Sequence, residues 1–312
     1  MRLIKDKTSI DFLGAKRRNI ALSISAVMII VSLASIFTRG LEFGIDFTGG
    51  VLLEVAYTEA ADLDAIRSNL AADGFNDAQV QLFGRETDVL VRLPPQGESA
   101  EEVRRKLQQT LSGDGLGMEL RRVEAVSAQV GSELAEKGAL AMVVALLMIF
   151  VYVMVRFQWK FSAGAVAALV HDVIVTVGFF SIFALPFDLT VVAAVLAVIG
   201  YSLNDTVVVF DRIRENFLGL RGVSAEEAMN ISINEMLART LITGLTTLLV
   251  LVALLVFGGE SIAPFSIALI VGIIVGTYSS IYAASATALL LDISPQDLIE
   301  PVKDPSLIDD LP

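Results

Sequence analysis

Long runs of apolar residues dominate this chain and predict six membrane-spanning helices. The runs cover residues 20–37, 138–155, 161–185, 189–210, 239–257 and 265–291. Each run reaches the roughly 17–25 residues that a helix needs to cross a ~30 Å hydrocarbon core. The sixth is long enough to tilt or to extend into water. The predicted bundle therefore consists of a first span at 20–37 and five further spans within 138–291.

Lys and Arg residues between the runs predict the orientation. They occur in the N-terminal segment 1–19, between the second and third runs, and between the fourth and fifth runs. The short connections 186–188 and 258–264 contain none. The positive-inside rule then places both termini, including the acidic tail 292–312, in the cytoplasm. An alternative is that the first run is a cleaved signal peptide, although it is longer than the usual apolar segment of about 7–15 residues.

The composition supports this class and excludes several others. Apolar residues make up 54% of the chain and charged residues 19%, as in a membrane protein with one polar domain. The chain has no cysteine, which excludes disulfides and thiolate chemistry. A net charge of −12 argues against binding to nucleic acid. No nucleotide-binding motif is present, so ATP is not expected to supply the energy, and we expect no enzyme, cofactor or metal site.

Residues 38–137 form the one long polar segment, on the outer (periplasmic) side in this orientation. Alternating apolar positions predict strands at 51–57, 78–83, 89–93 and 119–126, with helices at 62–73 and 99–111. The order β-α-β-β-α-β predicts a small α+β ferredoxin-like domain. It begins with a glycine-rich motif containing Gly44, Asp46, Gly49 and Gly50, which lacks the Lys and the helix start of a phosphate-binding loop.

A second polar segment, 211–238, joins the fourth and fifth runs. Met229, Ile233 and Leu237 recur in it at helical spacing. This pattern predicts an amphipathic helix lying on the cytoplasmic membrane surface. Within the spans, Gly200, Gly272 and Gly276 are expected to allow helices to pack closely.

Asp205 is the most informative residue, because a carboxylate inside hydrocarbon costs at least a few kcal/mol unless it is paired, hydrated or protonated. Arg239, at the start of the fifth run, is expected to reach a similar depth and to pair with it. Burial favours the neutral acid, whereas a nearby arginine favours the carboxylate. The pair is therefore either a proton-dependent switch or a fixed salt bridge between two helices.

Further polar residues inside the spans are weaker candidates for proton coupling. Asp172 lies near the middle of the third run and either carries protons or bonds to a neighbouring helix. His171, the only histidine, is either functional or a satisfied polar group, and adjacent residues on a helix are not expected to face one partner. Asn204 and Ser202 flank Asp205 and either support it or connect helices. A carboxylate with such neighbours suits H⁺, and also Na⁺.

The same motifs resemble the SecD/SecF family of protein-export membrane subunits, on its SecF side. The matching segments are VIGYSLNDTVVVFDRIREN at 198–216, GIDFTGG at 44–50, RT and GLTT at 239–240 and 244–247, and HDV at 171–173. The resemblance implies half of a resistance–nodulation–division core in the bacterial inner membrane, completed by SecD. It also implies association with the SecYEG channel and YajC, contact with exported preprotein, and use of the proton-motive force, with Asp205 and Arg239 in proton conduction.

Three functions are consistent with these observations. The leading one is an accessory subunit of the Sec translocase driven by protons. The alternatives are a half-size exporter of lipids or small molecules and a structural scaffold in which Asp205 is static. In each case the six helices are expected to leave an apolar face for a partner or for membrane lipid.

Overall fold

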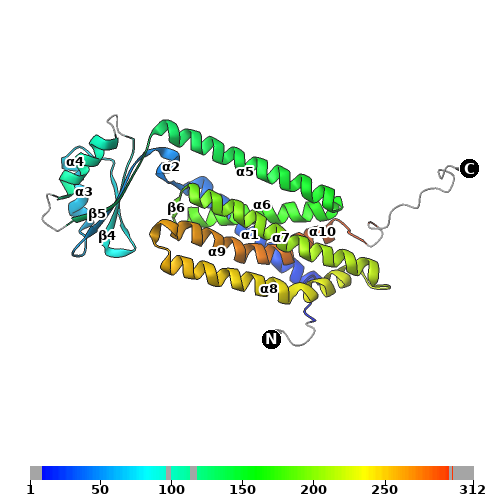
Figure 1. Ribbon diagram of the computed structural model, residues 1–312. Helices are drawn as coiled ribbons and strands as arrows, with labels where there is room; N and C mark the ends of the chain where they lie inside the picture. The colour runs from blue at the N-terminus through cyan, green and yellow to red at the C-terminus, as the bar shows by residue number, and fades with distance from the viewer. Residues whose placement is uncertain (1–8, 96–99, 113–117, 295–296, 298–312) are drawn as a thin grey trace, which may run out of the picture.

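Six long helices and a small α/β domain make up the structure, a computed structural model that describes residues 9–95, 100–112, 118–294 and 297 (Figure 1). Residues 1–8 of the predicted N-terminal segment and most of the predicted acidic tail lie outside these residues. Five helices are α1 (Ala15–Arg39), α5 (Ala128–Arg156), α6 (Trp159–Ile182), α7 (Leu189–Gly219) and α8 (Ala225–Phe257). The sixth consists of α9 (Ala263–Ser279), the π-helical segment η2 (Ser280–Ala284) and α10 (Ser285–Leu290). All six are long and apolar enough to cross a membrane, which confirms the predicted spans.

Three of these helices form the centre of the bundle. About half of the most apolar window is buried in α6, α7 and the α9–α10 helix, at 56%, 50% and 56%, but only 17% in α1 and α8 and 6% in α5. The face of α5 therefore remains largely uncovered, with Leu147, Met148 and Val151 all exposed. Such a face needs lipid or another membrane protein against it.

Two of the three expected close-packing glycines have that role. A Cβ atom on Gly272 would lie 2.1 Å from the Val198 side chain, and one on Gly276 would lie 3.1 Å from the Ser202 side chain. Both contacts join α9 to α7. A Cβ on Gly200 would meet no atom within 4 Å, so the prediction for Gly200 is wrong within the described structure.

The predicted amphipathic helix at 211–238 is not a separate element. Helix α7 continues to Gly219 and α8 begins at Ala225, so only a short turn separates two helices of 31 and 33 residues. Met229, Ile233 and Leu237 are buried in the apolar core of the bundle. The periodicity does mark a helical face, but that face packs against protein because the helices extend beyond the apolar runs.

The α/β domain has the predicted β-α-β-β-α-β order. Its elements are β2 (Gly50–Tyr57), α3 (Leu63–Ala72), β3 (Gln79–Phe83), β4 (Arg85–Leu93), α4 (Ala100–Ser112) and β5 (Met118–Val126). They form an antiparallel sheet in the order β3-β4-β2-β5. Strand β4 begins four residues earlier than expected. The domain is also shorter than predicted at its end, because α5 begins at Ala128.

Alternation along the central strands decides which face of the sheet is buried. Val51, Leu53 and Val55 of β2 belong to the core that includes residues of α3 and α4. Leu52 and Glu54 therefore point to the opposite face, because successive side chains on a strand alternate. This second face is turned toward the helix bundle (Figure 1).

Three short elements between the sheet and the bundle were not predicted. They are α2 (Ile45–Thr48), inside the glycine-rich motif, and the two-residue parallel strands β1 (Glu42–Phe43) and β6 (Pro186–Phe187). Elements of two to four residues carry too little periodicity to be recognised in a sequence.

Gly50 is expected to be much less tolerant of substitution than Gly74. Both have a positive φ, +123° and +94°, but a Cβ on Gly50 would lie 2.1 Å from the Leu93 carbonyl oxygen, whereas one on Gly74 meets nothing within 4 Å. Gly74→Ala should cost about 1–2 kcal/mol from backbone strain, and Gly50→Ala should cost more. Thermal unfolding of the purified protein in detergent measures the difference. Equal effects would contradict the role assigned to this close approach.

Candidate functional site

Asp205 lies inside the bundle on α7, with only 9% of its surface exposed. The Thr240 hydroxyl on α8 donates a hydrogen bond to Asp205 Oδ1 at 2.8 Å. The other oxygen, Oδ2, is buried and has no hydrogen-bond partner among the described residues. One neutral donor compensates a buried negative charge poorly, whereas a protonated carboxyl group loses far less on burial. The site is therefore suited to an acid that gains and loses a proton.

The predicted ion pair between Asp205 and Arg239 is not present. Within the described structure no nitrogen of Arg239 lies within 4.0 Å of a carboxylate oxygen, and its side chain is exposed. The reason is the rotation of about 100° between neighbouring helical residues. Thr240 is buried and faces α7, so the adjacent Arg239 points out of the bundle.

A second buried acid, Asp172, occupies a separate cluster between α6, α7 and α9. It is fully buried, and its Oδ2 accepts hydrogen bonds from Ser202 Oγ at 2.5 Å and Ser279 Oγ at 2.8 Å. Its Oδ1 lies 3.0 Å from His171 Nδ1. Ser202 therefore connects α7 to α6, which is the second of its two expected roles, and it does not bond to Asp205. The sequence did not predict the direct contact between His171 and Asp172.

Where α9 passes into the π-helical segment η2, two consecutive serines bond to polar residues of α6 and α7. Ser279 reaches Asp172, while the following residue, Ser280, forms a 2.8 Å hydrogen bond with Thr206 on α7. Both of these consecutive serines therefore form hydrogen bonds inside the bundle. π-helical turns occur frequently at functional sites. A run of hydroxyl groups, Ser202, Thr206, Ser279 and Ser280, consequently lines the contact between α7 and the sixth helix.

The sequence predictions missed Thr240, Ser279, Ser280 and Thr206. Thr206 and Ser202 had a detectable signal, since they are four residues apart on the helix that carries Asp205. Thr240 is adjacent to the arginine that was favoured in its place. Ser279 also had a signal, since it follows Gly272 and Gly276 by seven and three residues on one face of α9. No comparable signal marks Ser280, the first residue of the π-helical segment.

Several polar side chains of the spans face outward. Asn204, Arg239 and Thr243 are all exposed on α7 and α8. In the described residues, no group of three or more His, Cys, Asp or Glu side chains is arranged to hold a metal ion. His171 Nε2 is buried without a hydrogen-bond partner in the described part of the chain. The groups available for ion chemistry are therefore carboxylates, hydroxyls and this imidazole.

The glycine-rich motif joins the α/β domain to two helices of the bundle. The Gly44 amide donates to the Phe187 carbonyl at 2.9 Å, and Asp46 Oδ2 accepts from the Leu189 amide, at the start of α7, at 3.1 Å. Gly131 of α5 packs so closely that a Cβ there would lie 2.8 Å from the Gly49 amide nitrogen. The motif is therefore a structural junction between the α/β domain and the bundle.

Known proteins similar to this chain share its whole length. A family model described as "Protein export membrane protein SecD/SecF, C-terminal" matches residues 106–294, and the "SecD/SecF GG Motif" matches residues 34–61. The protein translocase subunit SecF of Pseudomonas aeruginosa is 49% identical over 97% of this chain and 98% of its own length. The subunit of the same name from Vibrio alginolyticus is 46% identical over 100% and 99%.

A solved structure has the same fold. The crystal structure of SecDF, a translocon-associated membrane protein from Thermus thermophilus, matches 94% of this chain at 35% identity with a TM-score of 0.84. This chain spans 40% of the length of that SecDF chain. The matched SecDF chain is therefore more than twice as long as this chain.

Proposed function

Because the chain belongs to the SecD/SecF family of protein-export membrane proteins, we propose that it is an accessory subunit of the Sec translocase that couples proton flow to polypeptide export. The observation that carries this proposal is Asp205, a buried acid with one neutral hydrogen-bond donor and one unpartnered oxygen. Proton uptake from one side and release to the other, linked to a change in helix packing, converts the gradient into movement.

The helix packing around Asp205 supplies the element that responds to its charge. When the acid is protonated, the Thr240 bond and a neutral carboxyl group suit the packed arrangement. When it is ionised, the buried charge attracts a cation or water, because its desolvation is otherwise uncompensated. Arg239, on the adjacent position of α8, is the nearest candidate to supply that charge after a rotation of the helix.

Asp172 is the second acid of the proposed proton route. Its bonds to Ser202 and Ser279 link it to the hydroxyl-lined contact of α7 with the sixth helix, and His171 is its one basic neighbour. Proton transfer along hydroxyl and carboxyl groups needs such short contacts. Replacement of H⁺ by Na⁺ is the competing chemistry, because carboxylate and hydroxyl oxygens also suit a hard cation.

The partner that completes the site is a second membrane half, SecD. The exposed polar side chains Asn204, Arg239 and Thr243 lie within spans, where contact with hydrocarbon is unfavourable. The largely uncovered α5 and the fact that the matched SecDF chain is more than twice as long point the same way. Further partners are the SecYEG channel, YajC, the exported preprotein and membrane lipid.

The proposed location is the bacterial cytoplasmic membrane, with both termini in the cytoplasm. Lys and Arg residues near the helix ends on the side of the bundle opposite the sheet, including Arg156, Lys160 and Arg212, support this orientation. The α/β domain then lies in the periplasm.

Preprotein export into membrane vesicles with and without an imposed proton gradient tests the function. Vesicles that contain the chain with SecD should export several-fold more protein when the gradient is present, and vesicles without the chain should show no such increase. A gain that depends on a Na⁺ gradient instead identifies the other ion. Export that ignores both gradients would leave only the scaffold role. The curated relatives above are named translocase subunits, which does not favour an exporter of lipids or small molecules.

A further inference from the structure

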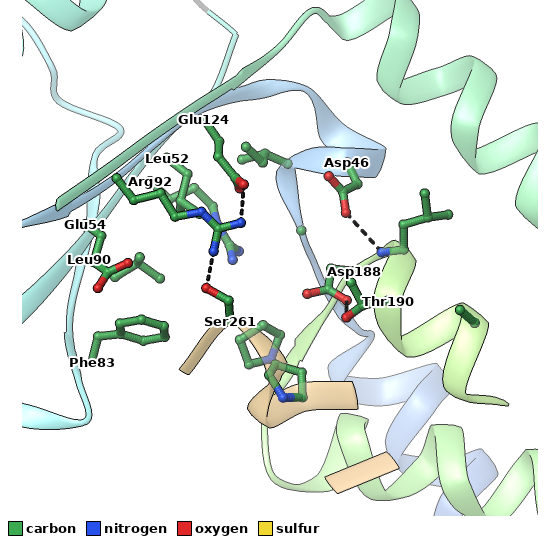
Figure 2. Close-up of a pocket in the computed structure, with 17 residues that line it drawn as sticks. Asp46, Leu52, Glu54, Phe83, Leu90, Arg92, Glu124, Asp188, Thr190 and Ser261 are labelled. Atoms are coloured by element: carbon green, nitrogen blue, oxygen red, sulfur yellow. Dashed lines mark hydrogen bonds and ion pairs between the residues drawn. The ribbon is translucent and has the colours of Figure 1, made fainter. Parts of the chain in front are cut away.

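A cleft of about 500 Å³ separates the α/β domain from the outer end of the bundle (Figure 2). One wall is the sheet face that points away from α3 and α4. The other wall is formed by the glycine-rich motif, the start of α7 and the connection before α9, which includes Ser261. Its volume is in the range of ligand-binding pockets, roughly 300–1,000 Å³. The cleft lies at the start of α7, whereas Asp205 lies further along the same helix and Asp172 lies on α6.

The sheet wall of the cleft alternates charged and aliphatic side chains. Strand register makes neighbours of Arg92, Leu52 and Glu124 in one row and of Leu90, Glu54 and Arg122 in the next. Each row thus carries one acid, one base and one aliphatic residue across three strands, and Phe83 borders them (Figure 2). This mixture differs from the opposite face, which forms the apolar core of the domain, and it suits a ligand with polar and apolar parts.

Two of these charged groups have unused bonding capacity. Within the described part of the chain, the one hydrogen bond of the Arg92 side chain goes to the Phe43 carbonyl at 3.2 Å, and its buried Nε has no partner. Burial lowers the pKa of Arg92, while the charges of Glu42 and Asp188 oppose this shift. The Glu54 carboxylate makes no hydrogen bond or ion pair with any described residue, although the Glu54 backbone belongs to the β2 ladder. By contrast, Arg122 is bonded to both Glu124 and Ser261.

The spacing of the two unused groups matches an extended peptide. Arg92 on β4 and Glu54 on β2 are diagonal neighbours in the sheet. Diagonal positions on adjacent antiparallel strands lie about 7–8 Å apart. Two residues of an extended chain span nearly the same length, about 6.6–6.8 Å. An extended peptide can therefore place a backbone carbonyl at Arg92 and a backbone amide, about two residues away, at Glu54. Its side chains alternate, and every second one then rests on Leu52, Leu90 or Phe83.

We propose that this cleft binds an extended segment of the polypeptide being exported, with Arg92 and Glu54 bonding its backbone. The proposal rests on the proposed function for the source of the polypeptide. Binding through the backbone and through shallow apolar contacts explains how one site accepts segments of many sequences. The bond between Arg122 and Ser261 bridges the two walls, so that the cleft keeps its width in the absence of a ligand.

Site-specific cross-linking tests the proposal in the intact translocase. Phe83 is replaced by p-benzoylphenylalanine, and a radiolabelled export precursor is arrested part-way by a folded C-terminal domain. Cross-linking to the precursor is expected at least fivefold above the yield from the same photoreactive residue at Ser68, which is exposed on α3. Equal yields at the two positions, or adducts only with lipid or another membrane subunit, would overturn the proposal.

Substitutions within the cleft provide an independent measurement. Arg92→Gln and Glu54→Gln should each lower the Phe83 cross-linking yield at least threefold, whereas Arg85→Gln, on the same strand but outside the cleft lining, should not. Yields that both cleft variants leave unchanged contradict the assigned contacts. Cross-linking is measured without a proton gradient. If export by the wild-type translocase responds to the gradient but Phe83 gives no adduct, only the proposal of peptide binding in the cleft is refuted. If Phe83 gives adducts but export does not respond to the gradient, only the proposed function is refuted.

Discussion

Asp205→Asn is expected to abolish the part of polypeptide export that depends on the proton gradient, with a loss of at least tenfold in the gradient-driven increase. Asparagine has nearly the same shape and keeps an oxygen acceptor for the Thr240 hydroxyl, but it cannot exchange a proton. The packing of α7 against α8 should therefore survive while the response to the gradient is lost. The measurement is the rate of preprotein export into vesicles with and without the gradient.

The matched control for this experiment is Asp211→Asn, the same substitution six residues further along α7. Asp211 forms an ion pair with Arg156 at 2.9 Å, and both side chains are about 40% exposed. Exposed pairs of this kind contribute little, about 0–1 kcal/mol, so export should change by less than twofold. A loss of complex assembly in Asp205→Asn, with gradient-driven export per assembled complex unchanged, would show that the acid only joins helices.

Thr240→Val separates the hydrogen bond from the acid. Valine keeps the shape of threonine and removes the one donor to Asp205. Because the hydroxyl stabilises the carboxylate, its loss should shift the pH dependence of gradient-driven export toward higher pH and lower the maximum rate only a few-fold. The experiment is a pH profile of export in vesicles. A profile that superimposes on the wild type would contradict a direct role for this bond.

The membrane architecture could be predicted from the sequence because hydrocarbon leaves few alternatives. Every backbone polar group within a bilayer must be bonded internally, so a long apolar run becomes a helix. The ends of helices were less predictable. Residues 211–238 contain charges and follow an apolar run, yet α7 and α8 continue through them, because Met229 and Ile233 pack into the bundle core. Hydropathy marks where a helix meets lipid and does not mark where it stops.

The site illustrates the same limit at the level of single side chains. Asp205 and Asp172 were identified because charge in an apolar run is costly wherever it points. Their partners depend on the rotation and register of neighbouring helices, which decide that Thr240 faces inward and Arg239 outward. Thr240 and Arg239 are neighbours on α8, and a rotation of about 100° per helical residue is enough to turn one side chain inward and the other outward. The π-helical segment that begins at Ser280, whose hydroxyl bonds to Thr206, adds a register change with no pattern in the sequence.

Asp172→Leu should strongly destabilise the bundle. It removes the acceptor of the Ser202 hydroxyl and the partner of the His171 Nδ1 atom, while the Ser279 hydroxyl keeps its second acceptor, the Gly276 carbonyl. Each unsatisfied polar group costs about 1–3 kcal/mol, so the total loss is on the order of several kcal/mol. A fall in the thermal unfolding midpoint in detergent, relative to the wild type, is the measurement.

Asp172→Asn distinguishes the structural contribution of this residue from proton transfer. The amide oxygen still accepts from Ser202 and Ser279, and the amide nitrogen donates to a neutral His171. Stability should therefore fall by much less than in Asp172→Leu, whereas gradient-driven export should fall about tenfold if the acid passes protons between the hydroxyl-lined contact and the rest of the route. Full gradient-driven export by a stable Asp172→Asn protein would assign the residue to helix packing alone. That result would leave Asp205 as the single acid through which the gradient acts.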